Sequence, residues 1–133
     1  MKNRRTYILI GLLALIVFIA MNIKKEITFS EYAKTKIENK IIDFGVAKLG
    51  DTIKQVYVIE NISDKHFVIA ELMSQKDVFF KGTILDKSNF PGQKKVIYVQ
   101  FVPETKGSVS RQIEVVSNST SGIIKLELKG IVE

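Results

Sequence analysis

The chain has 133 residues, a length that predicts a single folded domain. It has no cysteine, which excludes disulfides, thiolate metal sites and thiol redox chemistry. The net charge of +6 comes from 20 Lys and Arg against 14 Asp and Glu, and half of it belongs to the basic tail at residues 1–5. The remaining lysines alternate with acidic residues and form no basic stripe with stacking aromatics, so we expect no nucleic-acid binding.

An uncharged apolar segment occupies residues 6–23. A helix of about 18 residues, with a rise of about 1.5 Å per residue, spans about 27 Å, close to the thickness of a bilayer's hydrocarbon core. A cleaved signal peptide is the alternative. If Ala20 preceded the cut, however, Phe18 would occupy the second position that requires a small side chain. We therefore predict a retained transmembrane signal anchor at 6–23.

The charges on the two sides of this segment predict its orientation. The basic tail and the terminal amine precede it, whereas Lys24 and Lys25, partly offset by Glu26, follow it. This bias predicts a single-pass membrane protein with a cytoplasmic N-terminus and a periplasmic or extracellular C-terminal domain. Residues 24–36 are mixed and polar, and we interpret them as a stalk between the membrane and a domain at 37–133.

From residue 37 onward, apolar and polar residues alternate, which indicates strands with one buried and one solvated face. The clearest strands are expected in 94–102, 108–118 and 123–132, and weaker ones in 36–45, 52–61, 66–73 and 78–82. In 94–102, Ile97, Val99 and Phe101 share the face expected to be buried, and Tyr98 lies on the opposite face.

Turn sequences separate these strands. The stretch Phe90-Pro91-Gly92-Gln93 has Pro where φ is fixed near about −65° and Gly where φ must be positive, which indicates a type II turn. Short strands with turns every 8 to 12 residues or so are typical of a sandwich. We therefore predict an all-β fold: an Ig-like antiparallel β-sandwich of about seven to eight strands, preceded by one transmembrane helix.

The tripeptide Asp43-Phe44-Gly45 matches a protein-kinase motif. A kinase also needs a Gly-rich loop, a strand lysine and a His-Arg-Asp loop upstream of it, whereas the single histidine here, His66, lies downstream. A structural role is the better interpretation. At period two, Phe44 is expected to point into the core and Asp43 to face solvent, while Gly45 permits a bend or bulge where the first strand changes sheets.

Several of these features recur in a fixed order over roughly residues 37–133: Asp43-Phe44-Gly45, Gly50, Asn61, Pro91-Gly92, Phe101, Gly107, Ser117-Asn118 and Gly130. The pattern resembles a bacterial family of Ig-like domains of unknown function, which is similar to the ASH, MSP and PapD-like sandwiches. The resemblance implies an Ig-like fold in the cell envelope and no particular reaction. Many members carry a Cys-Gly-Cys segment after the third strand. This chain has Met-Ser-Gln-Lys-Asp at 73–77 instead, so cysteine chemistry does not carry over.

The sequence shows no pattern typical of a catalytic, cofactor or metal site, and we expect a non-enzymatic protein without a cofactor or a small-molecule substrate. His66 has no second histidine or cysteine to share a zinc ion with. The turn aspartates lack the spacing of a calcium loop: Asp51, Asp64, Asp77 and Asp86. The hydroxyl cluster at 117–121 has no neighbouring base and is expected at a hairpin tip. Asn61 and Asn118 fit the glycosylation pattern, but turn roles explain both.

The segment 77–90 is the best candidate for a binding surface. Phe79 and Phe80 put aromatic rings on both faces of one short strand, and Tyr98 lies on the solvated side of its own strand. Burial of both phenylalanines is one interpretation. The other is an exposed apolar patch formed by Phe79 or Phe80 with Tyr98, a feature that marks protein-binding sites.

These observations favour a membrane-anchored extracytoplasmic module that binds or scaffolds other cell-envelope or secreted proteins. Unpaired edge strands, expected at 66–73 and in the first strand, would offer backbone groups to a partner's strand. The alternative is a periplasmic chaperone or carrier for secreted subunits, although such chaperones typically use two sandwich domains and this chain has room for one.

Overall fold

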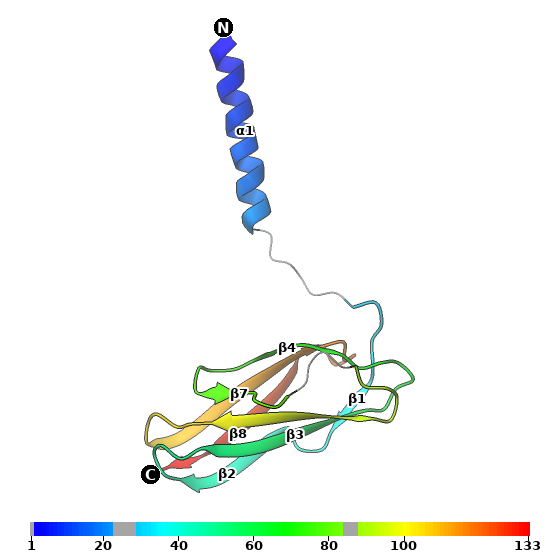
Figure 1. Cartoon of the computed structure of the whole chain (residues 1–133), viewed down its shortest axis with the longest axis vertical. Helices are drawn as coiled ribbons and strands as arrows, with labels where there is room; N and C mark the ends of the chain where they lie inside the picture. The colour runs from blue at the N-terminus through cyan, green and yellow to red at the C-terminus, as the bar shows by residue number, and fades with distance from the viewer. Residues whose placement is uncertain (1, 23–28, 84–87) are drawn as a thin grey trace.

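The computed structural model describes residues 2–22, 29–83 and 88–133 (Figure 1). Helix α1 (Lys2–Asn22) contains a stretch, Asn3–Met21, whose mean hydropathy of 1.9 and length of 19 residues suffice to cross a membrane. None of that stretch is buried. The helix fits a membrane span and a signal sequence alike. The flanking residues Lys24, Lys25 and Glu26 lie outside the described residues.

Within the described residues, eight strands form two four-stranded sheets packed face to face, which confirms the predicted sandwich. One sheet has the order β1 (Thr35–Ile37), β3 (Ile53–Asn61), β6 (Lys94–Phe101) and β5 (Val78–Phe79). The other has the order β2 (Ile41–Ala47), β8 (Ile124–Val132), β7 (Gly107–Ser117) and β4 (Ile69–Met73). The strands expected at sheet edges, β4 and both parts of the first strand, are edge strands.

One strand pair departs from the antiparallel pattern, since β2 pairs with β8 in parallel. The chain passes from one sheet to the other between β1 and β2, at residues 38–40. The change of sheet therefore comes before Asp43-Phe44-Gly45, and the expectation that it would occur at Gly45 is wrong. Phe44 and Gly45 both lie within β2, which stays in one sheet throughout.

Gly45 does permit the predicted bulge. Its φ is +77°, and the β2–β8 register shifts between Asp43 and Val46. Asp43 is exposed, and its Oδ1 accepts a hydrogen bond from the Gly45 N–H at 2.8 Å. Phe44 packs against the core with its ring centroid 5.7 Å from that of Phe101. The tripeptide is thus a bulged strand segment that places one aromatic ring between the sheets.

The core lies between the sheets and follows the predicted alternation. Ile97, Val99 and Phe101 of β6 are buried against apolar residues of β7 and β8, namely Val109, Ile113, Val115, Ile124, Leu126 and Leu128. The turn at Phe90–Gln93 has its Gln93 N–H bonded to the Phe90 carbonyl at 3.1 Å and φ of +81° at Gly92, as a type II turn requires.

The folded domain begins before Ile37. Ala33 is fully buried and bridges to Ser119, and strand β1 starts at Thr35. The last residues assigned to the stalk therefore belong to the sandwich. The β7–β8 connection is also more enclosed than a hairpin tip, because Ser117, Asn118 and Ser119 are all buried where residues 31–35 cover them.

Candidate functional site

The outer face of the β3–β6 pair carries an apolar surface where a sandwich usually has polar side chains. The outward residues of β3 face those of β6, with Val56 opposite Tyr98 and Val58 opposite Val96. Phe79 of β5 pairs with Gln100, two residues from Tyr98 along β6, so it is the diagonal neighbour of that ring. We call these residues the β3–β6 patch: Val56, Val58, Phe79, Val96 and Tyr98.

Four of the five side chains are well exposed: Val56 by 48%, Val58 by 38%, Phe79 by 44% and Tyr98 by 46%. Two of the residues predicted from the sequence, Phe79 and Tyr98, thus lie on one surface. Phe80 does not join them, since it is half-buried and packs against the core. The two valines of β3 were missed, although their alternation with the buried Tyr57 and Ile59 was a readable signal.

Neighbouring residues hold Tyr98 in place. Its backbone N–H donates to Thr83 Oγ1 at 2.9 Å, and the same hydroxyl donates to the Tyr98 carbonyl at 3.3 Å. A side chain at Gly82 would lie 3.7 Å from the Tyr98 ring, so the ring rests against this glycine. The segment after β5 therefore takes the place of a further strand beside Tyr98 and fixes the position of its ring.

Lysines surround the patch at both ends. At one end, Lys54 and Lys81 line a cavity of about 210 Å³ together with Val56, Tyr98 and Gln100. At the other end, Lys36 and Lys94 line a cavity of about 190 Å³ beside Val56 and Val58, with Glu60 between them. An apolar centre with a charged rim is the usual composition of a protein-binding surface. Within the described residues, no group of three His, Asp or Glu side chains is close enough to hold a metal ion.

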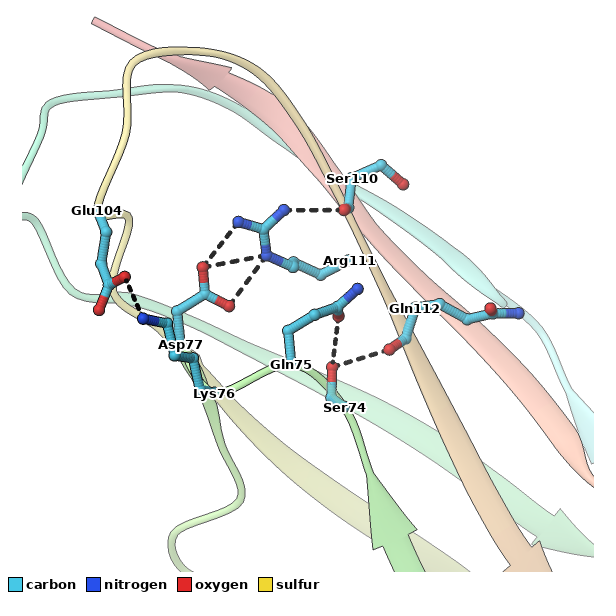
Figure 2. A network of polar contacts seen from close by, with 8 residues as sticks. All are labelled: Ser74, Gln75, Lys76, Asp77, Glu104, Ser110, Arg111 and Gln112. Atoms are coloured by element: carbon cyan, nitrogen blue, oxygen red, sulfur yellow. Dashed lines mark hydrogen bonds and ion pairs between the residues drawn. The ribbon is translucent and has the colours of Figure 1, made fainter.

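A polar site, separate from the β3–β6 patch, joins the two sheets (Figure 2). The Arg111 guanidinium on β7 bonds the Asp77 carboxylate, with Nη2 2.7 Å from Oδ2 and Nε 2.9 Å from Oδ1. It also lies over the Phe101 ring, 5.4 Å from the centroid. These hydrogen bonds raise the pKa of Arg111 above its ordinary value, although burial acts against this. The pair stabilises contact between the sheets.

Asp77 lies in a turn, as expected of the aspartates, but its side chain is only 6% exposed and bonds Arg111 instead of its own backbone. Asp51 does have a turn role, accepting the Lys48 N–H at 3.0 Å, and Asp64 is exposed, while Asp86 lies outside the described residues. The signal for the pair was present in the sequence, since Arg111 stands between Val109 and Ile113 on the inward side of its strand.

The segment 73–77, where the resemblance places cysteines in many relatives, is held by polar contacts here. Ser74 Oγ donates to the Gln112 carbonyl at 2.8 Å, and Lys76 forms an exposed ion pair with Glu104 at 3.4 Å (Figure 2). Together with Asp77, these contacts fasten the segment between β4 and β5 to the rest of the sandwich. These residues therefore have a structural role.

Tyr57 also makes a polar contact across the core. Its side chain is 1% exposed, and its hydroxyl donates to the Glu127 carbonyl of β8 in the opposite sheet. Burial, with a smaller effect from the Glu127 charge, raises the pKa of Tyr57 to about 12. The phenol is thus kept neutral as a hydrogen-bond donor.

The remaining sequence candidates have structural positions. His66 is exposed in a turn, with its ring 4.7 Å from that of Phe90. Asn61 and Asn118 are buried, and each uses its amide nitrogen to bond loop carbonyls: Lys65 and Asn89 for Asn61, Glu31 and His66 for Asn118. Turn roles explain both asparagines, as expected.

Comparisons with known proteins agree with this architecture. The chain is similar to a protein of unknown function from Porphyromonas gingivalis W83, with 15% identity and a TM-score of 0.65 over 79% of this chain and 49% of that chain. It is also similar to the ASH/PapD-like domain (PapD-like domain 7) of human CEP192, with 16% identity and a TM-score of 0.60 over 84% of this chain and 94% of that chain. The chain thus spans about half the length of the Porphyromonas protein.

A third likeness is to the VesB protease of Vibrio cholerae, with 10% identity and a TM-score of 0.59 over 75% of this chain and 32% of that chain. At such identities these likenesses show the fold alone. No curated protein matches the chain. The model of the family described as "Protein of unknown function (DUF1573)" matches residues 35–132, which covers the whole sandwich. The chain therefore belongs to the DUF1573 family, and its fold is that of the Ig-like, PapD-like sandwiches.

Proposed function

We propose that this protein is a membrane-anchored, non-enzymatic binding module that holds another cell-envelope protein against the β3–β6 patch. The observation that carries the proposal is the row of exposed apolar side chains on a sheet face that alternation would normally make polar. The rings of Phe79 and Tyr98 are the largest of these side chains, and aromatic residues commonly supply most of the binding energy at protein interfaces.

The charges around the patch specify the partner's chemistry. The rim has four lysines, at positions 36, 54, 81 and 94, against two acidic residues, Glu38 and Glu60, so positive charge is in excess. A complementary partner surface would have apolar side chains at its centre and Asp or Glu at its margin, since opposite charges speed association and select against wrong partners. We therefore expect the partner to be a protein with an acidic rim around an apolar contact surface.

The length and hydropathy of α1 support the anchoring part of the proposal. The excess of positive charge before the apolar segment at 6–23 supports a cytoplasmic N-terminus and export of the sandwich. On this account the helix keeps the domain at the membrane and raises its local concentration around envelope partners.

A photo-cross-linking amino acid in place of Tyr98, in the full chain in intact producing cells, tests the proposal. A matched control carries it at Val46, which is 61% exposed on the other sheet. We expect a saturable cross-linked product from position 98 and none from position 46. Val56→Asp should lower the yield of the product from position 98 about tenfold, because partner binding would then bury a charge opposite Tyr98. Val46→Asp should leave this yield unchanged. Equal yields from both positions, or indifference to Val56→Asp, would refute the binding surface.

The same experiment separates the module from the carrier alternative. A stable module is expected to cross-link to a folded partner at steady state. A carrier would cross-link only to newly exported, unfolded subunits, and the product would disappear when protein synthesis is stopped.

A further inference from the structure

One end of the sandwich carries a second set of exposed apolar side chains, separate from the β3–β6 patch. Four segments meet there: residues 29–34, 62–68, 88–93 and 118–123. We call these segments the tethered end. Each presents one large apolar side chain to solvent: Tyr32, exposed by 56%, Ile62 by 54%, Phe90 by 54% and Ile123 by 53%.

Hydrogen bonds join the four segments into one surface. Asn118 Nδ2 donates to the Glu31 carbonyl at 3.2 Å and to the His66 carbonyl at 2.7 Å. Asn61, at the end of β3, donates to the Asn89 carbonyl at 3.1 Å. The Ile62 N–H donates to the Lys34 carbonyl at 3.0 Å. Because buried asparagines hold the loops, the exposed side chains project from a fixed base.

The covalent path of the chain indicates what covers this surface. Ala33 is fixed in the tethered end by two backbone hydrogen bonds, to the Asn118 carbonyl at 2.8 Å and from the Thr120 N–H at 2.9 Å. The stretch between Asn22 and Ala33 can span at most about 40 Å, at about 3.6 Å per residue. The tethered end is therefore the part of the sandwich next along the chain to α1, and Figure 1 shows the chain joining the sandwich at this end.

We propose that the tethered end rests on the outer surface of the bilayer, with Tyr32, Ile62, Phe90 and Ile123 in the headgroup region. The proposal rests on the anchoring proposed above. A tyrosine, with an apolar ring and a polar tip, is well suited to this interface. Among these segments Lys34 and Lys65 are balanced by Glu31 and Asp64, so apolar contact rather than attraction to anionic lipid holds the surface down.

This contact orients the β3–β6 patch. Strand β3 ends and strand β6 begins at the tethered end, so β3 runs toward the bilayer and β6 runs away from it. Their outer face is then directed along the membrane plane. A partner bound there stands beside this protein on the same membrane.

The chain has no tryptophan, so a single introduced one reports without background. Full-length protein with Phe90→Trp is placed in vesicles of zwitterionic lipid brominated near the headgroup. Leu49→Trp, in the β2–β3 turn at the opposite end, is the control for the domain, and Leu15→Trp in α1, with lipid brominated deep in the acyl chain, is the control for the anchor. Ile123→Trp gives a second reporter from another loop. We expect bromine to quench the tethered-end reporters at least about twofold, with Leu49→Trp unaffected.

Each outcome of the quenching experiment either supports or contradicts contact between the tethered end and the bilayer. If Leu15→Trp is quenched while Phe90→Trp and Ile123→Trp behave like Leu49→Trp, the domain stands off the bilayer and this inference is wrong, while the anchor remains. If Leu15→Trp is not quenched, anchoring fails and this inference fails with it. Quenching at the tethered end that disappears at high salt would contradict the assignment to apolar contact.

Discussion

Arg111 binds Asp77 through three hydrogen bonds, of 2.7, 2.9 and 3.1 Å, and so ties strand β7 of one sheet to the segment that leads into β5 of the other. We expect Asp77→Ala to lower the free energy of unfolding by about 2–3 kcal/mol, because it leaves a partly buried guanidinium unpaired. This is below the cost for fully buried pairs, since the Arg111 side chain is 22% exposed. Urea unfolding of the full chain in detergent, followed by circular dichroism, measures the change.

The neighbouring ion pair supplies the control. Lys76 and Glu104 are 85% and 58% exposed, so Lys76→Ala should change the free energy of unfolding by less than about 0.5 kcal/mol. A double variant Asp77→Ala, Arg111→Leu should recover part of the loss, because no charge is then left without a partner. An equal cost for Asp77→Ala and Lys76→Ala would contradict a structural role for the buried pair.

The tyrosine between the sheets predicts a loss of stability at alkaline pH. The pKa of Tyr57 is raised from 10.0 to about 12 in the folded protein. Below pH 10 the phenol is neutral in both states and contributes no pH dependence. Between about pH 10 and 12 the unfolded chain loses this proton first, so the free energy of unfolding falls by up to about 1.4 kcal/mol per pH unit.

Tyr57→Phe tests this assignment. At neutral pH it should cost about 1–2 kcal/mol, because the Glu127 carbonyl loses its donor from Tyr57. Above pH 10 the difference between the variant and the natural chain should shrink. A difference that stays constant from pH 8 to 11.5 or so would show that Tyr57 does not titrate differently in the two states.

The Phe44 ring lies where a side chain at position 130 would be, so only glycine fits there. A side-chain carbon at Gly130 would lie 2.5 Å from Cδ2 of the Phe44 ring. We expect Gly130→Ala to cost about 1–3 kcal/mol in the free energy of unfolding, because the ring must move. Adding Phe44→Leu should remove part of this cost in a double-mutant cycle.

Gly45 is the matched control for this cycle. Its φ is +77° and the space around it is open, so Gly45→Ala should cost about 1 kcal/mol through backbone strain alone. Phe44→Leu should not reduce that cost. Equal rescue of both glycine variants would show that the Phe44 ring is not the obstacle at Gly130.

Asn118 joins three segments through one side chain, since its Oδ1 also accepts the Val68 N–H at 2.8 Å. We expect Asn118→Ala to lower the free energy of unfolding by about 2–3 kcal/mol, as the buried partners lose their hydrogen bonds. Asn118→Asp should cost at least as much, because a carboxylate would face the Glu31 and His66 carbonyls. Thr120→Ala, an exposed neighbour in the same loop, should be nearly neutral.

The alternation of residues predicted most of this fold because burial in a sheet has a period of two. That rule placed Ile97, Val99 and Phe101 in the core and Tyr98 outside it without any knowledge of pairing. It could not reveal that β2 lies parallel to β8, since the strand period is the same in parallel and antiparallel sheets.

The candidate site was predicted only in part for the same reason. Phe79 and Phe80 are adjacent, so one must face inward, and the sequence does not say which until β5 is paired with β6. Val56 and Val58 join the patch through cross-strand register with Tyr98 and Val96, which is a long-range property. In the sequence, Ala33 looks like any small residue in a polar stretch. Its burial could not be predicted because it depends on the distant Ser119.

Strand β8 is the last strand of the sandwich in chain order, yet it lies between β2 and β7 at the centre of its sheet. Strand β2 pairs with no other strand within the described part of the chain, so it has no strand to pair with until β8 has been synthesised. This sheet can therefore be completed only after the sequence of β8 has been synthesised.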